Sequence, residues 1–245
     1  HTTQGISAIN FPLGASYVAA YAKKELSNSC DVQLFKFPSH LAEALHKKPP
    51  TMLCFSDYCW NFELAYRFAS LAKKRDPNVI TVFGGPNFPT DPQEKLEFLK
   101  KRTAIDFYIE LEGELAFVDL TKNLMENNFN SLEFKKKGKT IINTCYVHDN
   151  HLIGGPIERI KDINILPSPY LTGMLDEYFN FPLIPMIETT RGCPFTCAFC
   201  VDAHAARDRV YRYDSQRTEE ELYYIAKRVK NEDNLVITDL NFAMY

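Results

Sequence analysis

The chain has 245 residues, of which 45% are hydrophobic and 24% are charged, and its formal net charge is −3. This composition is ordinary for a globular protein and gives no electrostatic reason to expect nucleic acid or an anionic membrane as a partner. No apolar run is long enough to span a bilayer, and no signal-peptide pattern opens the chain. The spacing of Cys30, Cys54, Cys59 and Cys145 is not typical of disulfide-bonded proteins. We therefore expect a cytoplasmic protein.

The first 133 residues alternate between apolar runs of strand length and amphipathic stretches. We predict strands at Ile6–Asn10, Val32–Phe37, Thr51–Ser56, Val79–Phe83 and Phe107–Ile109. We predict helices at Ala15–Leu26, Leu41–Lys47, Phe62–Lys74, Pro92–Lys101 and Leu115–Glu126. This alternation indicates an α/β domain with a parallel sheet that is covered on both faces.

Ligands of such sheets bind beyond the carboxyl ends of the strands. That rule brings four loops to one crevice: Asn10–Gly14, Ser56–Asn61, Gly84–Thr90 and Glu110–Glu114. The pair Gly84-Gly85 permits close approach of the backbone to a ligand or a positive φ. Trp60, the only tryptophan, stands after a strand, where it could cover a large flat ligand. A tight turn for the glycines and core packing for Trp60 are the alternative interpretation.

The pattern changes near residue 134. The basic run Lys135–Lys139 predicts a solvated hairpin tip, and Ile141–Val147 with His151–Ile153 predicts a two-stranded hairpin. The stiff segment Pro167–Tyr170 suits a linker, and Thr172–Tyr178 suits a short helix. We therefore predict a first domain at residues 1–133, a hairpin and linker at 134–182, and the start of a second domain at 183–245.

The second domain begins with a strand at Met186–Thr189 and a loop at Thr190–His204. A helix at Thr218–Lys230 and a strand at Leu235–Leu240 follow, and the capping-box spacing of Thr218 and Glu221 predicts the start of that helix. From Met186 onward there is room for about two strand–helix units.

The loop contains Cys193, Cys197 and Cys200 in the spacing Cys-x3-Cys-x2-Cys. This spacing supplies three thiolates to a cubane iron–sulfur cluster and leaves one iron open for chemistry, since no cysteine follows Cys200. A zinc site is the alternative, because His204 would complete a Cys3His set. Zinc ligands usually come from two separated knuckles, whereas these cysteines share one short loop.

The cysteine spacing, with Phe199 directly before the last cysteine, resembles the radical S-adenosylmethionine (radical SAM) enzymes. The resemblance implies a partial (β/α) barrel and a [4Fe-4S] cluster on Cys193, Cys197 and Cys200. The open iron would bind S-adenosyl-L-methionine, and one electron would release a 5′-deoxyadenosyl radical. It also implies that Phe199 packs near the adenine and that Asp239 and Asn241 contact this cofactor. A polar turn at a strand end is the alternative role for Asp239 and Asn241.

The first domain resembles the Rossmann-like cobalamin-binding domain that precedes the barrel in one branch of this family. Ser56 after one strand and Gly84-Gly85 after the next carry the resemblance, which implies a cobalamin site lined by these residues, with Trp60 beside them. The Asp-x-His-x-x-Gly motif of classical cobalamin domains does not occur in the first 133 residues, and many members of this branch also lack it.

We therefore expect a cobalamin-dependent radical SAM enzyme, with methyl transfer to an unactivated carbon as one outcome. The resemblance implies a small-molecule or biosynthetic-intermediate substrate and a flavodoxin or ferredoxin as electron donor. One alternative is a radical SAM enzyme without cobalamin, whose sheet domain serves as a substrate or partner module; another is a zinc-stapled binding protein. We expect the chain to lack the C-terminal part of its catalytic domain and to be inactive by itself, and the sequence does not identify the substrate.

Overall fold

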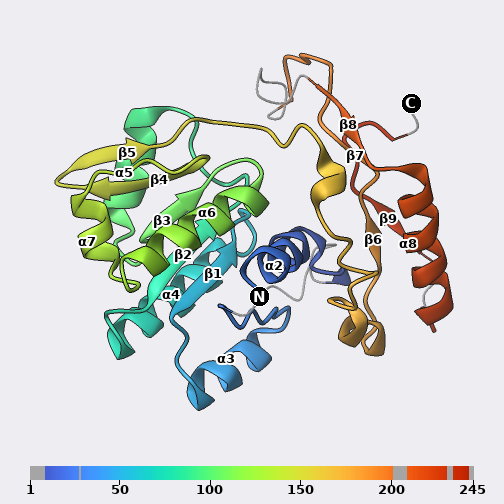
Figure 1. Ribbon diagram of the computed structural model, residues 1–245, viewed down its shortest axis with the longest axis horizontal. Helices are drawn as coiled ribbons and strands as arrows, with labels where there is room; N and C mark the ends of the chain where they lie inside the picture. Colours follow the sequence, from blue (N-terminus) through green and yellow to red (C-terminus); the bar gives the residue numbers. More distant parts are fainter. Residues whose placement is uncertain (1–8, 28, 201–208, 231–233, 243–245) are drawn as a thin grey trace. The chain divides into compact units, whose positions relative to one another are not determined.

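The computed structural model describes residues 9–27, 29–200, 209–230 and 234–242. The chain folds into two compact units (Figure 1). The first unit contains Phe35–Glu158, and the second combines Thr3–Leu34 with Arg159–Tyr245. Among the residues just given, no helix is both long enough and apolar enough to cross a membrane.

The first unit is built on a five-stranded sheet with the order β1-β2-β3-β4-β5. Its strands are β1 (Met52–Ser56), β2 (Ile80–Gly84), β3 (Phe107–Ile109), β4 (Thr144–His148) and β5 (His151–Gly154). Strands β1, β2 and β3 are parallel, and β4 and β5 extend the sheet in antiparallel fashion. The register pairs Ser56 with Gly84 and Gly84 with Ile109, so the three parallel strands end side by side.

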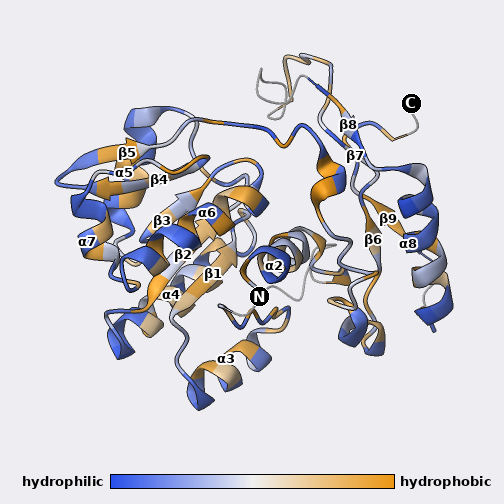
Figure 2. Cartoon of the chain, in the orientation of Figure 1, coloured by the Kyte–Doolittle hydropathy of each residue, from blue (hydrophilic) through white to orange (hydrophobic). Residues whose placement is uncertain are grey.

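Two hydrophobic cores form on this sheet because successive side chains of a strand point to opposite faces. Val82 packs in one core with Leu120, and Phe83 packs in the other with Phe62. The helices of this unit are α3 (Pro38–Lys47), α4 (Phe62–Arg75), α5 (Pro92–Lys101), α6 (Gly113–Glu126) and α7 (Ser131–Lys136). In Figure 2, strand β1 is mostly apolar, whereas these helices carry many hydrophilic residues. The layered α/β arrangement is the one predicted from strand–helix alternation.

Two predictions for this region are wrong. Val32–Phe37 is not a strand; it runs without a ladder partner, and Phe37 serves as the N-cap residue of α3. The basic run Lys135–Lys139 is not a hairpin tip, because Lys135 and Lys136 belong to α7. That helix forms because the Asn130 side chain accepts a hydrogen bond from the Glu133 N–H and because Phe134 is fully buried. Most of the predicted strand at Ile6–Asn10 lies outside the described residues.

The predicted hairpin is present, and it belongs to the first sheet. β4 pairs with β3 through Tyr108 and Cys145, and β5 pairs with β4. The end of the unit is held by Asn143, whose side chain donates to the Glu158 carbonyl at 2.8 Å and accepts from the Glu158 N–H at 2.7 Å. The compact units therefore differ in extent from the domains predicted at residues 1–133, 134–182 and 183–245.

The second unit contains α2 (Leu13–Leu26), β6 (Met186–Ile187), β7 (Thr190–Arg191), β8 (Tyr211–Arg212), α8 (Ser215–Arg228) and β9 (Val236–Ile237). Two short 3-10 helices precede β6: η1 (Ile163–Ile165) and η2 (Asp176–Asn180). β6 and β9 are parallel and are joined by a connection that contains α8, whereas β7 and β8 are antiparallel. The N-terminal segment joins this unit through the Phe11 N–H, which donates to the Ile184 carbonyl at 3.0 Å.

The last predicted helix exists but begins earlier than expected. Its N-cap residue is Asp214, not Thr218, and its last helical residue is Arg228. The predicted capping box is wrong because Glu221 is buried and pairs with Arg217 at 3.1 Å instead of reaching back to the helix start. The segment predicted as a helix at Thr172–Tyr178 forms turns followed by η2.

Candidate functional site

The first candidate site is the edge where β1, β2 and β3 end. Because Ser56, Gly84 and Ile109 are in register, the loops that follow them begin at one edge of the sheet. Three of the four loops predicted to share a crevice start from these strands. The fourth, Asn10–Gly14, belongs to the second unit.

Gly85 is required by a close approach between two of these loops. Its φ is +147°, and a Cβ at this position would lie 2.2 Å from the Asp57 carbonyl oxygen. The Asp57 N–H also donates to the Gly84 carbonyl at 2.7 Å. A Cβ on Gly84 would lie 3.1 Å from the Ile109 carbonyl oxygen. Glycine at both positions thus permits the close approach of neighbouring strand ends and loops within the protein.

Asp57 is the buried centre of this edge, and the sequence analysis assigned it no role. Its side chain is fully buried and accepts hydrogen bonds from the Tyr108 hydroxyl at 2.8 Å and from the Asn87 amide at 3.1 Å. Burial raises the pKa of this carboxyl, and the two hydrogen bonds and the Arg102 charge oppose that rise. Its position directly after a strand was the only signal in the sequence.

Trp60 and Ser56 lie at the surface of the same edge. The Trp60 side chain is 46% exposed and stacks on Tyr58 with 4.6 Å between ring centroids, so it is not a core residue. Asn61 shapes the loop, because its side chain accepts from the Tyr58 N–H and donates to the Ser56 carbonyl. An exposed stacked pair beside a hydroxyl group can receive a large ligand that has both apolar and polar parts.

The second candidate site is the cysteine loop of the second unit. The ladder of β7 with β8 closes the base of this loop, with Thr190 paired to Arg212 and Arg191 to Tyr211. Cys193 is half-buried, Cys197 and Cys200 are exposed, and all three are free thiols. Phe199 is 91% exposed. His204, the fourth ligand of the zinc alternative, lies outside the described residues.

The three thiols of this loop do not converge on one point in the structure. In the part of the chain that the structure describes, no three His, Cys, Asp or Glu side chains gather closely enough to hold a metal ion. The chemistry of the donors nevertheless fits an iron–sulfur cluster, because three free thiols share one short loop and none of them is in a disulfide.

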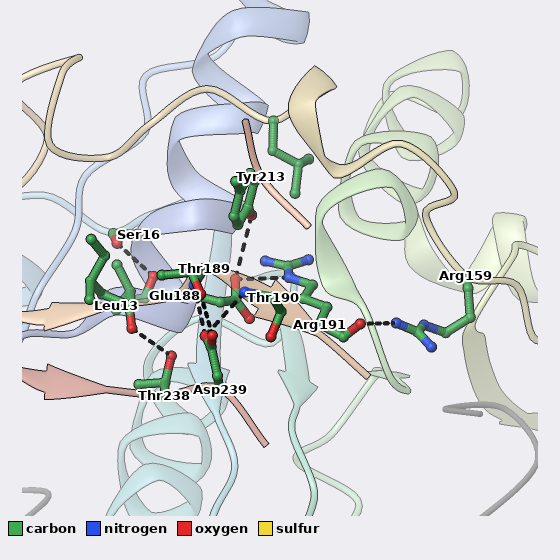
Figure 3. A network of polar contacts seen from close by, with 12 residues as sticks. Leu13, Ser16, Arg159, Glu188, Thr189, Thr190, Arg191, Tyr213, Thr238 and Asp239 are labelled. Carbon is green, nitrogen blue, oxygen red and sulfur yellow. Dashed lines mark hydrogen bonds and ion pairs between the residues drawn. The ribbon is translucent and has the colours of Figure 1, made fainter. Parts of the chain in front are cut away.

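Asp239 fastens the start of the cysteine loop to the end of β9 (Figure 3). One carboxylate oxygen accepts from the backbone N–H groups of Thr189 at 2.7 Å and Thr190 at 3.1 Å. The other oxygen accepts from the Thr189 hydroxyl. Both oxygens are thus engaged within the protein, which is the strand-end role offered as the alternative to a contact with S-adenosylmethionine.

Asn241 points to the cysteine loop itself. Its side-chain amide donates to the Cys193 sulfur at 2.8 Å. Hydrogen bonds to a ligating sulfur orient the ligand and alter its electron donation to a metal. The sequence analysis identified Asn241 as a cofactor contact, and its partner in the structure is a predicted cluster ligand.

Glu188, Arg191 and Tyr213 form a charged group at the base of the loop, as Figure 3 shows. Arg191 donates to a Glu188 carboxylate oxygen at 2.9 Å, and the Tyr213 hydroxyl donates to the same oxygen at 3.4 Å. The Arg191 side chain is only 11% exposed, so it is part of the packed base of the loop. Glu188 and Tyr213 were missed, because no spacing in the sequence connects them.

Comparison with protein families identifies one domain. The family described as "B12 binding domain" matches residues 6–121. This match agrees with the resemblance inferred from Ser56 and the Gly84-Gly85 pair.

The chain is also similar to two curated methyltransferases. It is 28% identical to 2-(S-pantetheinyl)-carbapenam-3-carboxylate methyltransferase of Streptantibioticus cattleyicolor, over 98% of the chain and 35% of that protein. It is 29% identical to the cobalamin-dependent radical SAM methyltransferase TokK of Streptomyces tokunonensis, over 80% of the chain and 28% of that protein. The chain thus spans about a third of the length of these relatives.

A solved structure shares the fold. The cobalamin-dependent S-adenosylmethionine radical enzyme OxsB, with aqua-cobalamin and S-adenosylmethionine bound, superposes with a TM-score of 0.69 at 17% identity, over 95% of this chain and 32% of that one. The comparisons confirm the resemblance to radical SAM enzymes that carry a cobalamin-binding domain. They also confirm the predicted α/β fold class with its Rossmann-like first domain.

Substituting Gly85 by alanine should destabilise the first unit by roughly 3–5 kcal/mol, because φ is positive and the added Cβ would overlap the Asp57 carbonyl. Gly154→Ala is the matched control, since a Cβ there would meet only the Cys145 Cβ at 3.9 Å. Urea unfolding of the two variants measures the difference. Equal midpoints would contradict the close approach described above.

Substituting Asp239 separates a fastening role from a ligand-binding role. Asp239→Ala leaves the Thr189 and Thr190 N–H groups without their acceptor and should destabilise the second unit by about 1–3 kcal/mol. Asp239→Asn keeps one carbonyl oxygen as acceptor and should cost less than half as much. If thermal unfolding in the absence of any cofactor is the same for both variants and the unsubstituted chain, the fastening role is refuted.

Proposed function

We propose that this protein is a cobalamin-dependent radical SAM enzyme. Its residues 6–121 match the B12-binding domain, and its relatives include a cobalamin-dependent radical SAM methyltransferase. We propose further that it transfers a methyl group to a carbon atom of a small biosynthetic intermediate. The observation that supports this most directly is the loop with three free thiols, closed at its base by β7 and β8, in the same chain as a B12-binding domain.

The cysteine loop would hold the iron–sulfur cluster through Cys193, Cys197 and Cys200. With its cofactors bound, such a site would supply reductive cleavage of S-adenosylmethionine to methionine and a 5′-deoxyadenosyl radical, and a methylated corrinoid would supply the transferred group. Asn241 would orient Cys193 through the N–H···S hydrogen bond, and Asp239 would fix the backbone from which the loop departs. The exposed Phe199 ring is available to pack on an adenine.

The corrinoid would bind at the edge formed by β1, β2 and β3. Ser56 offers a hydroxyl group there, and Trp60 stacked on Tyr58 offers an exposed aromatic face. Gly84 and Gly85 would contribute through the backbone, because the absence of Cβ atoms lets the strand ends draw together. We expect a flavodoxin or ferredoxin as electron donor and a reducing cytoplasm as the compartment that keeps the thiols free.

A second candidate is a radical SAM enzyme that does not use cobalamin. One observation favours it: residues 6–121, which match the B12-binding domain, lack the Asp-x-His-x-x-Gly motif whose histidine ligates cobalt in classical domains. The pattern does occur at Asp149–Gly154, but those residues form the turn and second strand of the β4–β5 hairpin outside that match. In this version the first unit would serve as a substrate or partner module. Corrinoid retention decides between the two candidates.

Replacing Cys193, Cys197 or Cys200 singly by alanine should remove the iron–sulfur chromophore and lower 5′-deoxyadenosine formation at least about 100-fold, because three thiolates are the minimum ligand set. The measurement uses the full-length protein, reconstituted anaerobically with iron and sulfide and then supplied with reductant and S-adenosylmethionine. Cys30→Ser, in the same unit, is the control and should retain its iron. One zinc and no iron per chain in the reconstituted unsubstituted protein would support the zinc-stapled alternative instead.

Substituting Trp60 by alanine should weaken hydroxocobalamin binding by about tenfold or more, because a large exposed ring that becomes covered by a ligand contributes heavily to affinity. Leu132→Ala is the control: Leu132 is also an exposed apolar residue of the first unit, but it lies on α7. Retention of the corrinoid through anaerobic gel filtration provides the readout. No retained corrinoid in the unsubstituted protein would favour the second candidate, and equal affinities of the two variants would exclude Trp60 from the site.

A further inference from the structure

Tyr17 of helix α2 contacts both ends of the cysteine loop. Its ring stacks on Tyr213, with ring centroids 5.9 Å apart and planes 8° from parallel. The Arg191 guanidinium lies 5.2 Å from the centroid of the Tyr17 ring. Arg191 directly precedes the loop and Tyr213 follows it. The buried Tyr17 ring therefore contacts the chain both before and after the cysteine loop.

We propose that Tyr17 is a positioning residue for the cysteine loop, acting through the Arg191–Glu188–Tyr213 group at its base. The proposal rests on the proposed function, because the consequence it predicts concerns the iron–sulfur cluster. Tyr17 lies inside the B12-binding match at residues 6–121, yet in the folded chain it belongs to the unit that carries the cysteines.

Other contacts also hold the base of the loop: Asp239 accepts from Thr189 and Thr190, and Arg159 donates to the Arg191 carbonyl. β7 and β8 contribute only two residues each to their ladder, and the Tyr213 N–H adds a hydrogen bond to the Thr189 carbonyl at 3.0 Å. Glu188 draws the two ends together, because it accepts from both Arg191 and the Tyr213 hydroxyl. The Tyr17 ring covers this charged group from α2 and excludes water from it, which strengthens the attraction between Glu188 and Arg191.

Arg217 of α8 extends the same stack. Its guanidinium lies 4.0 Å from the Tyr213 ring centroid and 5.9 Å from that of Tyr17. The side chain is fixed by the buried Glu221 carboxylate and by the Leu166 carbonyl. The Tyr17 and Tyr213 rings therefore lie among guanidinium groups whose own partners hold them in place, an arrangement in which cation–π attraction is strongest because it is desolvated.

The ring of Tyr17, rather than its hydroxyl group, carries this role. The hydroxyl oxygen is buried and has no hydrogen-bond partner among the described residues. Burial also raises the pKa of the phenol, which stays protonated. Removing an unpaired buried hydroxyl is close to neutral for stability, whereas removing the ring leaves Arg191 and Tyr213 without the surface that they pack on.

The first test measures hydrogen exchange in the cluster-free protein. Tyr17→Leu should speed exchange in peptides that cover residues 188–200 by about tenfold or more, because opening of the loop base becomes easier. Tyr17→Phe should leave that exchange unchanged. Phe179→Leu is the matched control, because it removes an aromatic contact of the same unit, with Phe11 at 5.0 Å, away from the loop. If Tyr17→Leu cannot be purified, Tyr17→Met replaces it, because methionine also removes the aromatic face and its flexible side chain fills irregular gaps.

The second test measures the cluster in the full-length protein. After anaerobic reconstitution, Tyr17→Leu should lose iron to a chelator about tenfold faster than the unsubstituted protein, and its reduced cluster should show a weaker change in the electron paramagnetic resonance spectrum when S-adenosylmethionine is added. Tyr17→Phe should match the unsubstituted protein in both measurements.

Two results would overturn the proposal: unchanged exchange at residues 188–200 in Tyr17→Leu, or equal exchange and iron loss in Tyr17→Leu and Phe179→Leu. The second result would mean that Tyr17 is ordinary core packing. If the unsubstituted protein binds no cluster, the proposed function fails, and the exchange experiment on the cluster-free protein still decides the role of Tyr17.

Discussion

The carboxylate of Asp239 is the contact on which the cysteine-bearing unit depends most. β6 and β9 pair over only two residues each, and a ladder that short is weak by itself. Asp239 lengthens the connection by accepting from Thr189 and Thr190, which lie between β6 and the cysteine loop. The hydrogen bonds to Asp239 thus supplement the short pairing of β6 with β9. They hold the strand ends in one arrangement, because two backbone N–H groups would be left unpaired if the strand ends moved apart.

The first unit uses a similar device at its own strand ends. Asp57 follows β1, is fully buried, and accepts from the side chains of Tyr108 and Asn87. Tyr108 belongs to β3 and Asn87 follows β2, so one carboxylate connects all three parallel strands where they end. Gly85 makes this possible, because a side chain at that position would collide with the Asp57 backbone. Burial of an acid at such an edge is favourable only because its oxygens are paired.

What could be predicted from the sequence is what is encoded locally. The cysteine spacing, the α/β fold class and the helices at residues 62–74, 92–101 and 115–126 follow from residues that are neighbours in the chain. The roles of Asp57 and Tyr17 could not be predicted, because their partners are distant in sequence and no periodicity links them. Tyr17 meets Arg191 only because α2 packs with the C-terminal part of the chain. The basic run was wrongly predicted to be a hairpin tip for the same reason, because the partners of Phe134 are also distant in sequence. Burial of Phe134 against the sheet stabilises α7 and outweighs the basic run that follows it.

The hydrogen bonding of Asp57 and Asp239 also bears on which side-chain groups are exposed at the two candidate sites. The oxygens of Asp57 and Asp239 accept hydrogen bonds within the protein, whereas other groups at these edges stay at the surface. At the first edge these are Ser56 and the stacked Trp60; at the second they are the thiols and the exposed rings Phe195, Phe199 and Phe242. A single exposed ring needs no explanation, but Phe195 and Phe199 flank Cys197, and Phe242 follows the residue that bonds to Cys193. Exposed aromatic rings close to the cysteines in the sequence suit a flat cofactor such as an adenine beside a metal cluster, which a site for zinc alone would not require.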